Sequence, residues 1–212
     1  QVRYNLTDSL ELAAGARYTK EKKRANQRNA YARAAFRQPD NPILSRYSDD
    51  NVSPEATLTW RPNSDTTLFA AYKTGYKSGG IANPIILTNA DTSDSVLFGN
   101  EKVDGGEVGY KARLFNRRLR LELVAYRYTF KGLQSSSYDS QLLRYVLRNA
   151  GSARTTGIEG SMDWQVSREF NLRGAFGYNR AKFVDFSSAP CYAGQAALGP
   201  AGGCGTGVQD VT

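Results

Sequence analysis

The sequence predicts an all-β protein, an antiparallel transmembrane β-barrel represented here by about eight of its strands. Apolar and polar residues alternate along most of the 212-residue chain, as they do when one face of a strand meets lipid and the other meets water. The connections between the expected strands alternate between very short turns and long loops. No segment reaches the roughly 18 apolar residues of a membrane-spanning helix, so strands are expected to cross the membrane.

In chain order, the strands are expected at about residues 1–6, 9–21, 49–61, 66–78, 103–115, 118–132, 146–166 and 169–184. The alternation is clear in the third of them, where Leu58 and Trp60 fall on one face and Thr57 and Arg61 on the other. Successive side chains of a strand project to opposite faces, so this spacing is the period of a half-buried strand.

The strand expected at 118–132 is less regular than the others. Its apolar residues first occupy odd positions, as at Leu121 and Leu123, and then even positions, as at Tyr126 and Tyr128. A β-bulge adds one residue to one strand and so shifts the parity. A bulge near Ala125 would account for the switch.

The connections and the aromatic residues favour a membrane barrel over a soluble fold. Short turns near 7–9, 62–65, 116–118 and 167–169 alternate with long loops near 21–48, 78–102, 132–147 and 184–212, as periplasmic turns alternate with extracellular loops. Aromatic residues form two expected girdles, one beside the short turns and one toward the long loops: Trp60, Phe115, Trp164 and Phe170, then Tyr18, Tyr72, Tyr76, Tyr128, Tyr178 and Phe183. A soluble β-sandwich would bury these rings, but its connections do not sort by length in this way.

The composition excludes several classes of function. The chain has no histidine, which removes Ser–His hydrolases and the commonest metal ligand. No nucleophile lies beside a base, so an enzyme is not expected, and two cysteines are too few for a zinc site. No cofactor is therefore expected. The net charge is +8, but the cations are spread over strands and one loop without a nucleic-acid motif, so no nucleic-acid partner is expected.

Several stretches resemble a known family when they are taken together. They are GARYTKE at 15–21, VSPEATLTWRP at 52–62, TLFAAYKTGYKSGG at 67–80, EVGYK at 107–111 with the pair 133–134, NAGSAR at 149–154, GIE at 157–159 and GYN at 177–179. In this order, and over nearly the whole chain, they resemble the TonB-dependent outer-membrane receptors, which transport ferric siderophores, cobalamin and related scarce solutes.

The resemblance implies that residues 1–212 are part of a barrel domain of about 22 strands. The plug domain, the TonB-contacting box and the C-terminal strands are expected to lie outside this chain. The implied function is the wall of an active-transport receptor for a scarce solute such as a ferric siderophore, energised through TonB. The implied location is the outer membrane of a Gram-negative bacterium, with lipid and lipopolysaccharide as partners. A structural or adhesive barrel without a transport role is the alternative.

Six charged residues are expected to face the barrel lumen: Lys73, Glu107, Lys111, Arg113, Glu159 and Arg173. Mutual pairing and hydration of a polar interior is their expected role. Family members differ in the residues that touch the solute, so no binding residue is carried over.

A basic stretch and two cysteines lie in the long loops. Residues 20–37 contain one acidic residue, Glu21, and seven basic residues: Lys20, Lys22, Lys23, Arg24, Arg28, Arg33 and Arg37. They could attract anionic ferric chelates or lipopolysaccharide phosphates, or they could form a solvated hairpin tip. Cys191 and Cys204 are expected to form a disulfide in an oxidising compartment, with two free thiols as the alternative. The stretch 49–51 is expected to be a boundary between loop and strand rather than a calcium site.

Overall fold

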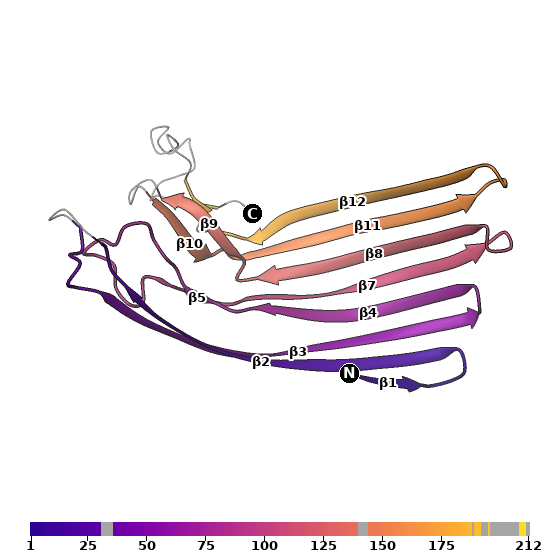
Figure 1. The fold of residues 1–212 in the computed structure, drawn as a ribbon, viewed down its shortest axis with the longest axis horizontal. Helices are drawn as coiled ribbons and strands as arrows, with labels where there is room; N and C mark the ends of the chain where they lie inside the picture. Colours follow the sequence, from indigo (N-terminus) through magenta and orange to yellow (C-terminus); the bar gives the residue numbers. More distant parts are fainter. Residues whose placement is uncertain (31–35, 140–143, 188, 192–194, 196–207, 211–212) are drawn as a thin grey trace.

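The computed structural model describes residues 1–30, 36–139, 144–187, 189–191, 195 and 208–210. Long strands lie side by side in one curved, open sheet, with the short turns at one end and the long connections at the other (Figure 1). No helix of the described chain is long and apolar enough to cross a membrane.

The main sheet has eight strands in the order β1-β2-β3-β4-β7-β8-β11-β12, and every neighbouring pair is antiparallel. The predicted all-β antiparallel fold is therefore confirmed. The strands are β1 (Val2–Asn5), β2 (Leu10–Gln27), β3 (Ile43–Asn63), β4 (Thr66–Lys77), β7 (Glu101–Leu114), β8 (Leu119–Lys131), β11 (Ser152–Gln165) and β12 (Asn171–Asp185).

Short strands occupy the long connections and form three small two-stranded sheets. They pair as β5 (Gly80–Ile81) with β6 (Leu97–Phe98), β9 (Gln134–Asp139) with β10 (Arg144–Asn149), and β13 (Ala189–Pro190) with β14 (Val208–Gln209). The long connections are thus partly ordered by their own backbone pairing.

The hairpin of β2 and β3 is longer than the sequence predicted. Its register runs without interruption from Leu10↔Trp60 to Gln27↔Ile43, so nearly half of the expected loop at 21–48 is strand, at 21–27 and 43–48. The prediction of a boundary at 49–51 was wrong, because these residues lie inside β3. Charged residues replace apolar ones on this extension, which removes the hydrophobic alternation without removing the backbone hydrogen bonds.

The strand expected at 146–166 is two strands, β10 and β11, separated at Ala150 and Gly151. The Asn149 side chain donates hydrogen bonds to the carbonyl oxygens of Gly99, Asn100 and Gly132. This amide therefore fixes the chain at the point where β10 leaves its own hairpin and β11 enters the main sheet.

The bulge expected near Ala125 is absent. The register of β8 is continuous through Ala125 against both β7 and β11. Apolar residues change faces there because the rings of Tyr126 and Tyr128 lie on the other face, each paired directly with a glycine of the next strand, Gly157 and Gly105. Glycine leaves room for a ring across the strand, so no extra residue is needed.

The buried apolar core of the described chain is small and lies under the long connections. It consists of Ile43, Leu87 and Val96, with Ile81 packed against them. Apart from Ile43 at the start of β3, the buried apolar residues of the main sheet are the alanines Ala13, Ala71 and Ala112. A single sheet has no second layer of secondary structure to bury large side chains. Both of its faces are therefore free to contact lipid, water or other protein.

Candidate functional site

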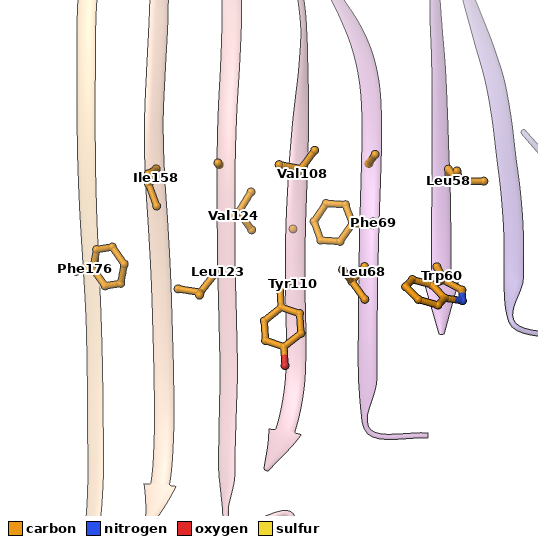
Figure 2. Close-up of a pocket in the computed structure, with 13 residues that line it drawn as sticks. Leu58, Trp60, Leu68, Phe69, Val108, Tyr110, Leu123, Val124, Ile158 and Phe176 are labelled. Carbon is orange, nitrogen blue, oxygen red and sulfur yellow. The ribbon is translucent and has the colours of Figure 1, made fainter. Parts of the chain in front are cut away.

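The cross-strand register divides the side chains of the main sheet between two faces, because directly paired residues project to the same side. One face, here called the apolar face, carries two parallel rows of mostly apolar residues. The rows are Leu58, Ala70, Val108, Ala125, Ile158 and Tyr178, and Trp60, Leu68, Tyr110, Leu123, Gly160 and Phe176. Figure 2 shows most of these side chains side by side across the strands.

The apolar face is exposed over a contiguous area. Leu58 is 42% exposed, Val108 57%, Ile158 48% and Phe176 59%. Soluble monomers rarely expose contiguous apolar surface of this kind, which marks a membrane or protein interface.

The aromatic girdles are confirmed only in part. Beside the short turns, Trp60 and Phe115 are exposed, and the Phe115 ring stacks on Trp164 at 6.3 Å between centroids. Toward the long connections, Tyr18, Tyr72 and Tyr178 lie on the apolar face. Tyr128 and Phe183 instead lie on the opposite face, so these two do not belong to an outward girdle. Tyr76 has the same parity in β4 as Tyr72, and its hydroxyl donates to Asp49.

The opposite face, here called the polar face, carries all six of the charged residues predicted to line a lumen. The Lys73 ammonium lies 2.5 Å from the Glu107 carboxylate, which also accepts a hydrogen bond from the Tyr128 hydroxyl at 3.1 Å. Lys111 pairs with Glu122 at 2.5 Å. The expected role in mutual pairing fits this geometry, while the assignment of this face to a lumen stays a prediction.

The remaining residues of the predicted set have different surroundings. Arg173 pairs with Asp163 at 3.2 Å, and the Glu159 carboxylate accepts a hydrogen bond from the Tyr126 hydroxyl at 3.3 Å. Arg113 lies directly across from Arg120, with no ion pair to the described residues. The structure therefore brings the six onto one face without gathering them into one binding pocket.

Asp49 is the centre of a hydrogen-bonded cluster that the sequence did not reveal. Its carboxylate accepts hydrogen bonds from the Tyr47 hydroxyl at 2.9 Å, the Tyr76 hydroxyl at 2.8 Å and the Asn100 amide at 2.6 Å. β3 and β4 stop pairing beyond Glu55↔Lys73. The Asp49 cluster thus bridges strands β3 and β4 where their backbones have separated.

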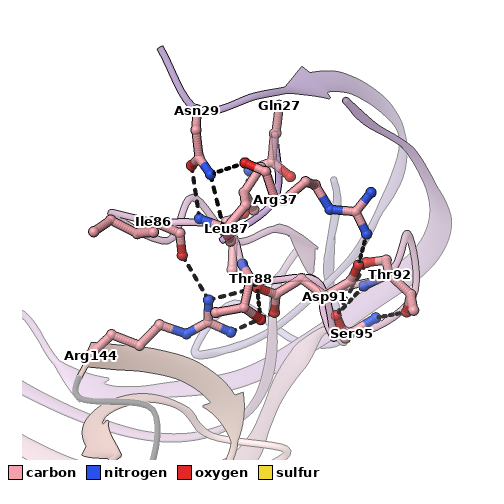
Figure 3. A network of polar contacts seen from close by, with 11 residues as sticks. Gln27, Asn29, Arg37, Ile86, Leu87, Thr88, Asp91, Thr92, Ser95 and Arg144 are labelled. Carbon is pink, nitrogen blue, oxygen red and sulfur yellow. Dashed lines mark hydrogen bonds and ion pairs between the residues drawn. The ribbon is translucent and has the colours of Figure 1, made fainter. Parts of the chain in front are cut away.

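A second cluster, here called the Asp91 clamp, ties three of the long connections together (Figure 3). The Asp91 carboxylate receives two hydrogen bonds from the Arg144 guanidinium, at 2.5 and 2.8 Å. The Arg37 side chain donates to the Asp91 carbonyl oxygen, and the Asn29 amide bonds both the amide nitrogen and the carbonyl of Leu87. The segment between β5 and β6 is therefore held to the β2–β3 hairpin and to the β9–β10 hairpin.

Burial and hydrogen bonding act in opposite directions on Asp91. Burial alone raises the pKa of this carboxyl, but hydrogen bonds from Arg144 and from the backbone and hydroxyl of Thr88 outweigh it and lower the pKa to about 2. The carboxylate is ionised at neutral pH, so the clamp is a charged contact. The spacing of Thr88 and Asp91, which suits a local turn, was the only sequence signal for it.

The predicted basic stretch at 20–37 has two kinds of residue. The Lys23 ammonium donates to the Ser78 hydroxyl at 3.2 Å and to the Gly79 carbonyl at 2.7 Å, so this lysine has a structural role. Lys20, Lys22 and Arg24 are exposed on β2. Arg33 lies outside the described residues.

The cysteine pairing stays a prediction. Cys191 is disulfide-bonded, and Cys204 lies outside the described residues. Among the residues that the structure describes, no group of three or more acidic or thiol side chains could hold a metal ion.

Comparison with known proteins gives consistent matches. A family model described as TonB dependent receptor-like, beta-barrel, matches residues 1–200. The chain is similar to the ferric yersiniabactin uptake receptor FyuA from Yersinia pestis, with a TM-score of 0.65 and 20% identity over 86% of this chain and 26% of that chain. No curated protein matches the chain.

Two further solved structures give the same picture. The alcaligin outer-membrane receptor FauA from Bordetella pertussis has a TM-score of 0.57 and 17% identity, over 86% of this chain and 29% of that chain. The copper transporter OprC has a TM-score of 0.65 and 16% identity, over 86% of this chain and 28% of that chain. The chain thus spans roughly a quarter of the length of these receptors, and identities this low establish a shared fold.

Proposed function

Because the chain belongs to the TonB-dependent receptor β-barrel family, we propose that it forms part of the wall of an outer-membrane receptor. This receptor takes up a scarce solute such as a ferric siderophore. The observation that carries the proposal is the family match over residues 1–200 together with a sheet that has an apolar face and a charge-paired face. A wall between lipid and an aqueous lumen needs both faces.

The names of the similar receptors support a metal chelate as the class of solute. FyuA is named for ferric yersiniabactin and FauA for alcaligin, while OprC is named for copper. The net charge of +8 would favour an anionic metal chelate over a cationic solute. We therefore place ferric chelates first and copper complexes second among the solutes to be tested.

Residues 1–212 supply barrel wall and outer connections in this proposal. Gating and energy transduction belong to a plug domain and a TonB-contacting segment elsewhere in the parent receptor. The family comprises transport receptors rather than enzymes, so no catalytic role is proposed. None of the comparisons favours a purely structural or adhesive barrel.

Solute uptake by whole cells tests the proposal. The parent gene is deleted from an iron-limited strain, and accumulation of labelled iron is measured over a panel of ferric chelates, with a copper complex alongside. Deletion is expected to abolish accumulation from at least one solute, and the reintroduced gene is expected to restore it. A strain lacking TonB but carrying the gene should accumulate as little as the deletion strain. Uptake that survives both deletions, for every solute, would count against the proposal.

A further inference from the structure

The apolar face changes character toward the long connections. In the row next to Val108 and Ile158, the register places Arg127, Thr156 and Arg180. In the row after that it places Arg154 and Lys182. Arg127, Arg154, Arg180 and Lys182, here called the outer basic cluster, therefore project from the same face as the apolar rows, and Arg127 and Arg180 border those rows directly.

The four cations of the outer basic cluster line one open surface hollow together with Thr156, Phe183 and Val184. Arg127, Arg180 and Lys182 are exposed. The cluster is formed by the three neighbouring strands β8, β11 and β12. β11 pairs continuously with β12 from Ala153↔Phe183 to Gln165↔Asn171, and the register shifts between Ser152 and Ala153, next to the cluster.

These cations have no anionic partner among the described residues, in contrast with those of the polar face. There Lys73, Lys111 and Arg173 each pair with a carboxylate. In the two rows of the cluster the one acid is Asp104, and Lys131 already pairs with it at 2.8 Å. Four like charges within one hollow repel each other, so their arrangement is favoured when an external anion binds.

Arg154 adds a second, independent indication of a missing anion. Its Nε atom is buried and has no hydrogen-bond partner. A buried donor of a charged group is unfavourable when it has lost its water and gained no acceptor. An acceptor oxygen in the hollow would remove that cost.

We propose that the outer basic cluster binds the phosphate of an anionic lipid headgroup whose acyl chains lie on the adjacent apolar rows. Arginine matches phosphate because its planar guanidinium can donate two parallel hydrogen bonds. The adjacent apolar rows distinguish a lipid from free phosphate, which would gain nothing from them. A solute in the lumen would meet the polar face and could not reach this hollow.

The location of the cluster selects the class of lipid. The cluster lies at the long-connection end of the apolar rows, the extracellular side if the sheet spans the outer membrane. The inference rests on the proposed function in this respect. A phosphorylated glycolipid such as lipopolysaccharide is the anionic lipid of that leaflet.

Binding of lipid A by the purified parent receptor in neutral detergent tests the proposal. Diphosphoryl lipid A is compared with the same glycolipid after removal of its phosphates. The test variant combines Arg127→Gln, Arg154→Gln, Arg180→Gln and Lys182→Gln. Each surface cation near a membrane contributes about 1 kcal/mol toward anionic lipid, so the Kd for the phosphorylated form should rise about tenfold or more. The Kd for the dephosphorylated form should not change.

A matched control removes four positive charges elsewhere on the same side of the sheet. It combines Lys20→Gln, Lys22→Gln, Arg24→Gln and Arg46→Gln, all exposed residues on the β2–β3 extension. This variant should bind diphosphoryl lipid A within about twofold of the unmodified receptor, because a surface charge acts over only about one Debye length. An equal loss in both variants would show a general charge effect and overturn the proposal.

Three further readouts keep the test decisive. A variant with Arg127→Lys, Arg154→Lys and Arg180→Lys keeps the charge and should retain most of the binding. If the fourfold variant does not fold, the single exposed change Arg180→Gln should still weaken binding about fivefold. Competition by millimolar inorganic phosphate that displaces the lipid completely would assign the hollow to free phosphate and overturn the lipid assignment.

Failure of this inference is distinguishable from failure of the proposed function. An unmodified receptor that inserts into the outer membrane and imports its solute, but binds both forms of lipid A equally, would overturn the lipid site alone. A receptor that is absent from the outer membrane would overturn the proposed function. The fourfold variant should import solute at the unmodified rate, because the cluster and the polar face lie on opposite sides of the sheet.

Discussion

Asp91 holds together connections that are distant in the sequence. Its carboxylate binds Arg144 of β10, and its carbonyl oxygen binds Arg37 of the connection between β2 and β3. Side chains of the ion pair are nearly inaccessible, at 6% for Asp91 and 12% for Arg144. A buried ion pair that loses one partner leaves an uncompensated charge, so the Asp91 clamp should respond sharply to the protonation of this one carboxyl.

The clamp should weaken in acid. The pKa of Asp91 is lowered from the ordinary aspartate value of 3.8 to about 2 in the folded protein. A lowered pKa stabilises the folded form above the unfolded pKa, and that contribution is lost as the pH falls from about 4 to about 2. It amounts to about 2 kcal/mol. Pepsin cleavage of the parent receptor within 82–96 should therefore increase over this pH interval.

The variant Asp91→Asn is the control for the acid response. It should be cleaved at pH 4 about as fast as the unmodified receptor at pH 2, with little further change on acidification. Protection of 82–96 in this variant equal to that of the unmodified receptor at pH 4 would contradict the role of the clamp.

Gly105 should not tolerate a side chain. A Cβ atom there would lie far inside van der Waals contact with the Arg127 carbonyl oxygen and close to the Tyr128 ring. Backbone cannot move aside as a side chain can, so Gly105→Ala should destabilise the parent receptor by about 1–3 kcal/mol. Urea unfolding followed by the heat-modifiable shift in electrophoresis measures the change.

Gly177→Ala provides the matched comparison for Gly105. The atom nearest to a Cβ there is the Glu159 Cγ at 3.8 Å, which is an ordinary contact. This variant should be neutral or more stable by up to about 1 kcal/mol, because alanine has less freedom in the unfolded chain. An equal loss in both variants would mean that the close approach at Gly105 is unimportant.

At the scale of the element, β8 shows why a strand can change character along its length. Its apolar face runs from Leu121 and Leu123 to Arg127 and Lys131, while its polar face runs from Glu122 to Tyr128. The register is continuous along both faces. Where the apolar rows end, charged residues follow on the apolar face and aromatic residues follow on the polar face. The position of this change along β8 therefore marks where the apolar surroundings of that face end.

The two faces of β3 should differ in their tolerance of charge. Leu58 lies on the apolar face and its neighbour Thr57 on the polar face. Leu58→Arg should cost about 2–4 kcal/mol in a lipid bilayer, and Thr57→Arg should cost about 1 kcal/mol or less. Equilibrium unfolding of the parent receptor from lipid vesicles compares the two variants. Equal costs would show that the apolar face does not meet lipid.

The sequence predicted the strands of the main sheet better than their ends. Period-2 alternation located residues such as Leu58 and Glu107 on the correct strands, because alternation follows directly from the strand backbone. The extension of β2 to Gln27 was missed because charged residues occupy both faces there. The break at Gly151 was missed because it depends on the side chain of Asn149 and on backbone oxygens distant in the sequence.

The candidate site was less predictable than the fold. Parity alone placed Lys73, Glu107 and Arg173 on one face. The outer basic cluster was not recognised, since Arg127 and Arg180 come together only when the strands are aligned. In the sequence, the only sign of the cluster was that Arg127 interrupts the apolar alternation of β8 after Ala125. That interruption was interpreted as a bulge.

At the scale of the whole molecule, the chain forms a curved wall with two unpaired edges. β1 and β12 are the outermost strands and do not pair with each other in the described part of the chain. Strand edges cannot remain unpaired in lipid, because each free backbone group there costs several kcal/mol. In a membrane these edges must therefore pair with other strands.

The central claim, a wall with lipid on one face and water on the other, is tested most directly by cysteine labelling of the parent receptor in intact outer membranes. Single cysteines are placed at Leu58 and Ile158 on the apolar face and at Thr57 and Glu159 on the polar face, in a background of Cys191→Ser and Cys204→Ser. We predict that a lipid-soluble maleimide labels the first pair and a charged, water-soluble one labels the second. Equal labelling of adjacent positions by both reagents would contradict the account.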